Sequence, residues 1–158
     1  MASAEPDLGA PPRQTTESLL MATSRSLRRA YDNRLAGLGL KLSEAYLLAH
    51  VHRRGPMTQT QLAEGLGLGR AATGAIVDAL ERKGLVERSA HAGDRRVWLV
   101  ASTERAAPVA DEAAAVDVAL REELWTGISR ADRRQLSEIL QRLEGNLAAI
   151  LNEQTERD

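Results

Sequence analysis

The sequence contains no cysteine and no phenylalanine, and aromatic residues make up only 3% of its 158 residues. The absence of cysteine excludes disulfides, thiolate metal sites and a cysteine redox sensor. No apolar stretch approaches the about 18 residues that cross a membrane, and the N-terminus has no apolar run flanked by basic residues. We therefore expect a soluble, cytoplasmic protein without a membrane partner.

The residue patterns of enzyme sites are also missing. The chain has no Gly-rich phosphate loop, no metal cluster and no nucleophile beside a base. His50 and His52 are two residues apart and point to different faces of a helix, while His91 lies far along the chain. We expect no enzyme activity, no cofactor and no metal.

Charge is distributed unevenly although the formal net charge is only −1. Residues 53–105 hold nine Lys and Arg against six Asp and Glu, net +3, and the remainder holds twelve against sixteen, net −4. The middle of the chain thus carries the positive share, as expected of a nucleic-acid surface, although charges scattered by chance over a solvated surface would give a similar count.

The same middle stretch has the pattern of two short helices. Thr58 and Gln61 form a capping box that predicts a helix over residues 58–64, followed by a glycine-containing turn. A second helix is predicted over residues 69–83, because one stripe at helical spacing is apolar. Its members are Thr73, Ile76, Val77 and Leu80. Two short helices joined in this way indicate a helix-turn-helix.

A two-stranded hairpin is predicted directly after these helices. Gly84 is placed to end the second helix, and strand-like runs at 85–88 and 97–102 are joined by the eight-residue loop SAHAGDRR. A hairpin appended to a helix-turn-helix makes a winged helix. Arg95 and Arg96 lie side by side at its tip, where Asp94 is expected to brace one of them.

The chain flanking the winged helix at 41–103 is expected to form dimerisation helices. These cover residues 15–40 and 104–152, with tails at 1–14 and 153–158. These helices carry more apolar surface than the winged helix can bury. A second copy of the chain could bury the rest, which favours a homodimer. The predicted dimer interface consists of leucine and isoleucine side chains from both flanks: Leu20, Leu27, Leu136, Leu140, Leu143, Leu147 and Ile150.

Five further residues indicate where helices begin. Ser43 and Thr103 are expected to cap the helices that follow them, and Ser129 with Asp132 predicts a cap for the last helix. Pro108 predicts a kink or a late start of the helix after Thr103. The fold class is therefore mainly α with a small β-wing.

In this order and spacing the chain resembles the MarR family of bacterial transcription regulators. The residues that carry the resemblance are LAEGLGLGRAATGAIVDALERKGLVER, then Asp94-Arg95-Arg96, then a strand ending in Ser102-Thr103-Glu104. The resemblance covers roughly residues 15–152. It implies a repressor that binds a pseudo-palindromic operator as a homodimer and is released by a small phenolic or lipophilic effector.

Two positions depart from the family pattern. Members often carry Thr or Ser followed by Arg in the middle of the second, recognition helix, where this chain has Gly74 and Ala75. The strand after the wing usually ends in Leu-Thr, and here it ends in Ser102-Thr103. The first departure removes the usual base-reading side chains, whereas the second changes packing only.

Binding to double-stranded DNA through the recognition helix and the wing gives each residue an expected role. Arg70 would meet a phosphate or a guanine edge, and small side chains would meet thymine methyls. The wing arginines would enter a narrow minor groove, while threonines at helix starts would contact phosphates. The residues expected to contact DNA are Thr58, Thr60, Arg70, Ala71, Ala72, Gly74, Ala75, Arg95 and Arg96.

Two questions remain open from the residues alone. A winged helix used only for protein interaction is the alternative to DNA binding, and the paired arginines argue against it. Tyr31, Tyr46 and His50 carry polar groups at the ends of their side chains on otherwise apolar helices. They could line an effector pocket, or they could be core residues whose polar groups are hydrogen-bonded within the protein.

Overall fold

The computed structural model describes the backbone of residues 15–91 and 94–155, and the side chains outside 91–97 up to residue 152. The expected N-terminal tail, residues 1–14, lies outside the described residues. The last helix continues through Thr155, past the start of the tail expected at 153. No helix in the described ranges is long and apolar enough to span a membrane.

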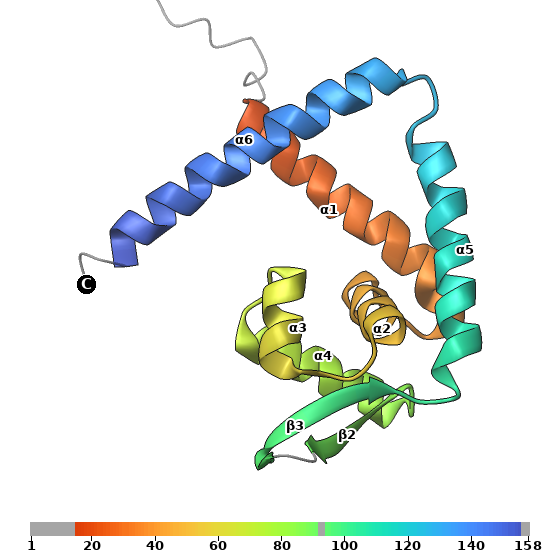
Figure 1. Ribbon diagram of the computed structural model, residues 1–158. Helices are drawn as coiled ribbons and strands as arrows, with labels where there is room; N and C mark the ends of the chain where they lie inside the picture. The colour runs from red at the N-terminus through yellow and green to blue at the C-terminus, as the bar shows by residue number, and fades with distance from the viewer. Residues whose placement is uncertain (1–14, 92–93, 156–158) are drawn as a thin grey trace, which may run out of the picture. The chain divides into compact units, whose positions relative to one another are not determined.

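The described elements alternate helices with one small sheet (Figure 1). In chain order they are α1 (Thr16–Leu35), the 3-10 helix η1 (Ala36–Leu38), α2 (Leu42–Arg54), β1 (Met57–Thr58), α3 (Gln59–Leu66), α4 (Arg70–Arg82), β2 (Val86–His91), β3 (Asp94–Ser102), α5 (Ala106–Leu124) and α6 (Arg130–Thr155). The chain divides into two compact units between Asp117 and Val118, inside α5.

The core of the first unit forms where the apolar stripes of its helices meet the sheet. In α4, Thr73, Val77 and Leu80 are fully buried, which confirms the stripe predicted from the sequence, and Ile76 is half-buried. Each of these positions follows the 3.6-residue period that keeps one face of a helix inward. The side chains that join α4 in the fully buried core come from α1, α2, α3 and the sheet: Leu35, Leu47, Leu48, Val51, Leu62, Val86 and Val100.

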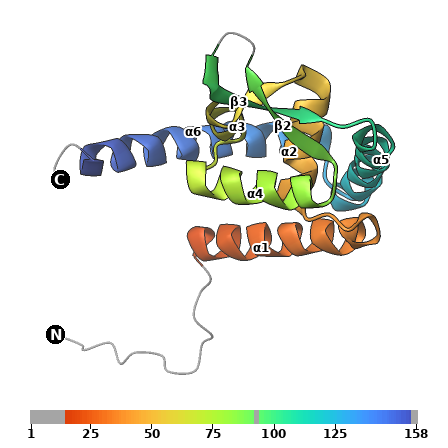
Figure 2. The same ribbon diagram turned by 90° about the horizontal axis from the view of Figure 1, so that it is seen from below.

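The sheet differs from the predicted two-stranded hairpin in two ways. Its order is β1-β3-β2, with both pairings antiparallel. β1 has only two residues, too few to give a periodic signal in the sequence. The predicted eight-residue loop is wrong, because Ser89, Ala90 and His91 pair with β3 and extend the hairpin. We call the β2–β3 hairpin the wing, and it lies against α3 and α4 (Figure 2).

Two of the predicted helix caps are corrected. Lys41, not Ser43, precedes α2, and Glu44 Oε2 accepts the Lys41 N–H at 2.8 Å. Thr103 does not cap α5, because its hydroxyl donates to Gly84 O at 2.8 Å. α5 instead begins at Ala106, so Pro108 falls in the first turn, where a helix needs no N–H from it.

Three local signals are confirmed. The Thr58 hydroxyl accepts the Gln61 N–H at 3.2 Å while Gln61 Oε1 accepts the Thr58 N–H at 2.9 Å, which is the predicted capping box. Gly84 has a φ of 68°, in the left-handed region that ends helices and favours glycine. The Ser129 hydroxyl accepts the Asp132 N–H at 3.1 Å at the start of α6.

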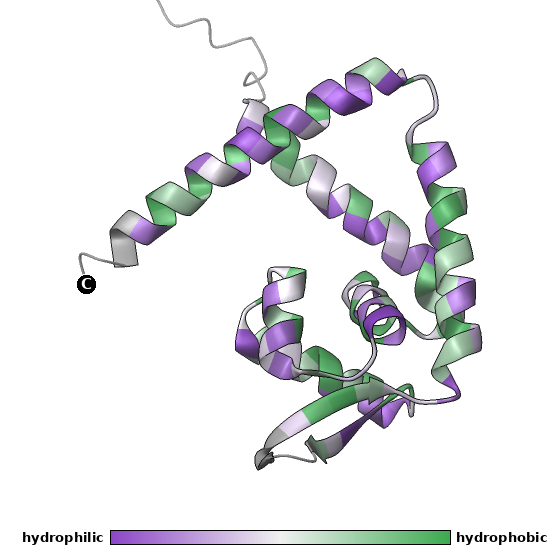
Figure 3. Ribbon diagram, in the orientation of Figure 1, coloured by the Kyte–Doolittle hydropathy of each residue, from purple (hydrophilic) through white to green (hydrophobic). Residues whose placement is uncertain are grey.

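The second unit, residues 118–158, contains the end of α5 and all of α6. The guanidinium of Arg133 lies 5.2 Å from the centre of the Trp125 ring, and Arg133 Nη2 donates to Trp125 O at 3.1 Å. These contacts fix the turn between the two helices. Apolar residues recur along α6 (Figure 3), and their side chains are exposed: Leu136, Ile139, Leu140, Leu143, Leu147, Ile150 and Leu151.

Candidate nucleic-acid interface

The turn between α3 and α4 sets the angle between these two helices. Gly67 ends α3 with a φ of 62°, and the Leu68 N–H donates to Ala63 O at 2.9 Å. Leu62 and Ala63 are buried on the inner side of α3. The backbone reversal at a left-handed glycine lets α4 begin at Arg70 immediately afterwards.

The exposed positions in the first half of α4 carry little side-chain bulk apart from Arg70. Arg70, Ala71, Ala72 and Ala75 are exposed, as expected for a helix that approaches a groove. The hydroxyl of buried Thr73 donates to Gly69 O at 3.1 Å, so this polar group is satisfied within the helix. A helix with this surface can bring its backbone close to a bulky partner.

Gly74 does not share that open face. It is half-buried, and a Cβ atom placed on it would lie 3.7 Å from Nε2 of Gln59, the first residue of α3. The carboxamide of Gln59 therefore occupies the space beside the glycine. Sequence reasoning missed Gln59, because no periodic pattern links the first residue of one helix to the middle of the next.

The two threonines expected at phosphates have different surroundings. Thr58 is half-buried, and its hydroxyl is occupied by the capping box with Gln61. Thr60 is exposed in the first turn of α3. Of the two hydroxyls, that of Thr60 has the more open position.

The wing is attached to α4 through Arg88 of β2. Arg88 Nη2 lies 2.5 Å from Asp78 Oδ1, and Arg88 Nη1 donates to Glu81 Oε2. Burial lowers the pKa of Arg88, but the hydrogen bonds and charges of Asp78 and Glu81 outweigh it, so the pKa is raised overall. The guanidinium of Arg88 thus links the wing to α4 through these two ion pairs. The sequence did not indicate this role.

Asp94, Arg95 and Arg96 lie at the start of β3. His91 pairs with Asp94 across the hairpin, and the register shifts between Ala90 and His91. The side chains of residues 91–97 are outside the described part, so the expected bracing by Asp94 stays a prediction. The backbone nevertheless puts both arginines beside the turn of the wing.

An ion pair between the exposed Lys83 and the buried Glu44 connects the other end of α4 to α2. Lys83 Nζ lies 2.6 Å from Glu44 Oε2 and donates to Gly39 O at 2.7 Å. The same carboxylate accepts the Lys41 N–H. α4 is therefore fixed at its C-terminal end to the segment that joins α1 and α2.

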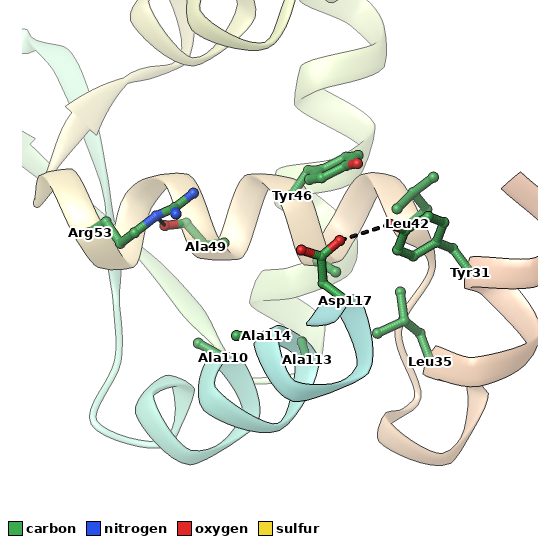
Figure 4. Close-up of a pocket in the computed structure, with 11 residues that line it drawn as sticks. Tyr31, Leu35, Leu42, Tyr46, Ala49, Arg53, Ala110, Ala113, Ala114 and Asp117 are labelled. Atoms are coloured by element: carbon green, nitrogen blue, oxygen red, sulfur yellow. Dashed lines mark hydrogen bonds between the residues drawn. The ribbon is translucent and has the colours of Figure 1, made fainter. Parts of the chain in front are cut away.

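A cavity of about 120 Å³ lies between α1, α2 and α5 (Figure 4). Tyr31 and Tyr46 are at its wall as predicted, and Tyr31 Oη donates to Asp117 Oδ1 at 2.8 Å. Small side chains on α5 leave the space open. The lining is Tyr31, Leu35, Leu42, Ala45, Tyr46, Ala49, Arg53, Ala110, Ala113, Ala114 and Asp117.

His50 does not line this cavity, so the structure does not bring it together with the two tyrosines there. It is on α2 but faces α3, where a Cβ atom on Gly65 would lie 2.8 Å from His50 Nε2. That nitrogen is buried and makes no hydrogen bond to any described residue. Within the described residues, no three His, Asp or Glu side chains are grouped so that they could hold a metal ion.

A helix-turn-helix followed by an antiparallel wing and joined by a short third strand defines a winged helix protein. The MarR family model matches residues 38–97. The transcriptional regulator PA3341 is 32% identical, with 85% of this chain and 99% of that chain covered and a TM-score of 0.73. The chain therefore belongs to the MarR family, whose members are transcription regulators and not enzymes.

Two further solved structures have the same fold. A MarR family transcriptional regulator from Rhodococcus sp. RHA1 is 26% identical, with 80% of this chain and 91% of that chain covered and a TM-score of 0.70. The MepR–DNA complex of S. aureus is 18% identical, with 87% of this chain and 99% of that chain covered and a TM-score of 0.77.

Proposed function

We propose that the protein is a cytoplasmic transcription regulator that binds a specific DNA operator, and that it acts as a repressor. The observation that carries this proposal is the open first half of α4 beside a wing that Arg88 links to α4 through ion pairs with Asp78 and Glu81. MepR was solved in complex with DNA, which supports the same use of a similar fold. In this arrangement α4 enters the major groove and the wing arginines reach the adjacent minor groove.

Side-chain readout by α4 is limited, because the exposed positions in its first half are Arg70 and three alanines. Thymine methyls are the base groups that alanine suits. Phosphate contacts then supply a large share of the affinity, from Thr60, from arginines and from backbone N–H groups. Affinity for DNA is accordingly expected to fall steeply as salt increases.

The test is selection of bound duplexes from a random-sequence pool, followed by titration of the enriched duplex at several salt concentrations. Enrichment of an inverted repeat is expected, with half-sites about one helical turn apart. A scrambled duplex of equal length is the control. If no sequence is enriched and neither duplex binds at low salt, the chain is a winged helix used for protein interaction.

The proposed DNA-binding form is a homodimer. The apolar seam of α6 is exposed, with Leu147 at 56% and Leu151 at 61%, and Leu19, Leu20 and Met21 near the start of α1 are exposed as well. Leu27 is half-buried. A second copy of the chain is the occupant proposed for these faces, since an inverted-repeat operator requires two-fold symmetry.

Light scattering tests the dimer with a matched pair of variants on α6. Leu140→Glu puts a charge into the seam and is expected to give monomers, whereas Gln141→Glu adds the same charge at an exposed position outside the seam. Wild-type protein that is monomeric at micromolar concentration would refute the dimer.

The cavity at Tyr31 is the proposed effector site. Its volume, about 120 Å³, is comparable to the roughly 150 Å³ of an engineered cavity that holds benzene, so a single-ring phenol fits better than a large lipophilic compound. The hydroxyl of Tyr46, the carboxylate of Asp117 and the guanidinium of Arg53 are polar groups at its wall.

Thermal shift with phenol tests this site, because a ligand that binds only the folded state raises the melting temperature. Ala113→Leu fills the cavity and is expected to abolish the shift. Ala115→Leu adds the same bulk to an exposed position outside the lining and should retain it. If phenol raises the melting temperature of both variants equally, it binds outside this cavity.

A further inference from the structure

Trp98 is a large indole in an unexpected position on the wing. Its side chain is 55% exposed, whereas Val100, two residues on and therefore on the same face of β3, is fully buried. Among the side chains described between residues 47 and 117, Trp98 is the single large apolar one that is exposed. On one face of β3, therefore, Val100 packs in the core and Trp98 is exposed to solvent.

The register of the sheet explains why the indole stays uncovered. On one side of Trp98 the partner in β2 is Ala90, which has only a methyl group. On the other side β1 pairs Met57 with Val100 and Thr58 with Leu99, and then ends. The next residue, Gln59, begins α3 instead of continuing the strand. Trp98 is therefore positioned where β1 gives way to α3.

The same Gln59 reaches toward α4. Its Nε2 atom lies 3.7 Å from the position of a Cβ on Gly74. Gln59 thus follows the β1 residue that pairs with Leu99, the neighbour of Trp98 in β3, and its carboxamide reaches Gly74 of α4. We call Trp98, Gln59 and Gly74 the band. This band joins the two elements that enter neighbouring grooves under the proposed function.

We propose that Trp98 and Gln59 contact the sugar–phosphate backbone of the DNA strand that runs between those two grooves. This inference rests on the proposed function. With α4 in the major groove and the wing in the adjacent minor groove, that strand crosses the band between them. Deoxyribose offers an apolar face to the indole, and phosphate oxygens accept hydrogen bonds from the indole N–H and the Gln59 carboxamide.

The chemistry around Trp98 fits DNA better than a protein partner. Arg95 and Arg96 precede Trp98 in the sequence of β3, and exposed Arg70 begins α4, so the two proposed DNA-binding elements carry three arginines. A single exposed indole is also far smaller than the contiguous apolar patches of several hundred Å² that mark protein interfaces. The contact adds affinity to a recognition helix whose first half exposes Arg70 and three alanines.

Backbone contacts carry no sequence information, which gives a specific test. Trp98→Ala is expected to weaken binding about tenfold, and by the same factor for the selected operator and for a scrambled duplex at low salt. Trp98→Phe keeps an aromatic ring and should lose less. Gln59→Ala should weaken both duplexes in the same way, with a melting temperature measured alongside to exclude misfolding.

Tryptophan fluorescence provides an independent readout, because the chain has two tryptophans. In the Trp125→Phe variant, Trp98 is the single reporter and its emission is expected to change on addition of operator duplex. In the Trp98→Phe variant, Trp125 in the second unit reports instead, and its emission should stay nearly constant.

The outcomes separate this inference from the proposed function. If wild-type protein binds no duplex, both fail together. If wild-type protein binds but Trp98→Ala and Gln59→Ala bind equally well and Trp98 emission is unchanged, the backbone contact alone is refuted. Loss of binding to the operator but not to the scrambled duplex would make these residues base readers. An emission change on dilution without DNA would make the indole a protein contact.

Discussion

Lys83 and Glu44 form an ion pair in which Nζ and Oε2 are 2.6 Å apart, although the two residues are 39 positions apart in the chain. The Glu44 carboxylate is buried, with 8% of its side chain exposed, and Lys83 is 36% exposed. Because Lys83 follows α4 directly and also bonds to Gly39 O, the pair fixes the recognition helix to the α1–α2 connection.

We expect Lys83→Met to lower the free energy of unfolding by about 1–3 kcal/mol, because it leaves a buried carboxylate with one partner fewer. Urea denaturation measures the change. Lys41→Met is the matched control, since the contribution of Lys41 to Glu44 comes from its main-chain N–H and survives the substitution. If the Lys83 variant is as stable as wild type, water replaces the ammonium group as the hydrogen-bond partner of the Glu44 carboxylate.

Arg88→Met is expected to loosen the wing more than it destabilises the fold. Asp78 and Glu81 are 61% and 40% exposed, so they stay hydrated and the stability loss is about 1 kcal/mol or less. Hydrogen exchange of the β2 and β3 amides should accelerate, and operator affinity should fall. Arg88→Lys should restore little, because an ammonium cannot span two carboxylates as a guanidinium does. Unchanged exchange would show that backbone pairing alone holds the wing.

His50 predicts a pH-dependent stability. Burial lowers the pKa of His50 from 6.5, and the charges of Arg54 and Arg53 lower it further. Since the folded pKa is below the unfolded value, His50 contributes stability that is present above about pH 6.5 and lost as pH falls through the folded pKa.

Thermal melts between about pH 7 and pH 5 measure this effect. His50→Gln should flatten the dependence relative to wild type. His52→Gln, at an exposed position on the same helix, should leave it unchanged. A pH profile that is the same in the His50 variant and wild type would assign the dependence to other groups.

Arg96→Ala is expected to weaken operator binding by about 1–3 kcal/mol without lowering the melting temperature, because a wing arginine acts on DNA and not on the core. Gel-shift titration measures the affinity. Arg142→Ala, at an exposed position on α6, controls for the loss of one positive charge. If the Arg96 variant binds the operator as tightly as wild type, the wing tip does not contribute to DNA binding.

The local features of the fold could be predicted from the sequence. The buried stripe of α4, the capping box of Thr58 and Gln61 and the left-handed Gly84 each depend on residues within two helical turns of one another. The wing was predicted too short, since SAHAGDRR contains small and charged residues that disfavour strands. Pairing with the complementary strand overrides that local preference.

The candidate site depended on contacts that no local pattern encodes. Gln59 beside Gly74, Arg88 between Asp78 and Glu81, and the face of α2 that His50 occupies follow from how helices and strands pack. The two tyrosines of the cavity were predicted, but the alanines of α5 that leave the space empty were not. In the sequence an alanine indicates only that a helix is favoured. Whether its small side chain leaves a cavity depends on how the neighbouring helices pack.

By itself, the sequence determined the main helices and the winged helix order, because helical period and glycine turns are short-range properties of the chain. Only the tertiary structure decided which side chains hold the wing to α4, which face the cavity and which remain exposed. These properties depend on long-range packing, in which residues distant in the chain replace water around one another.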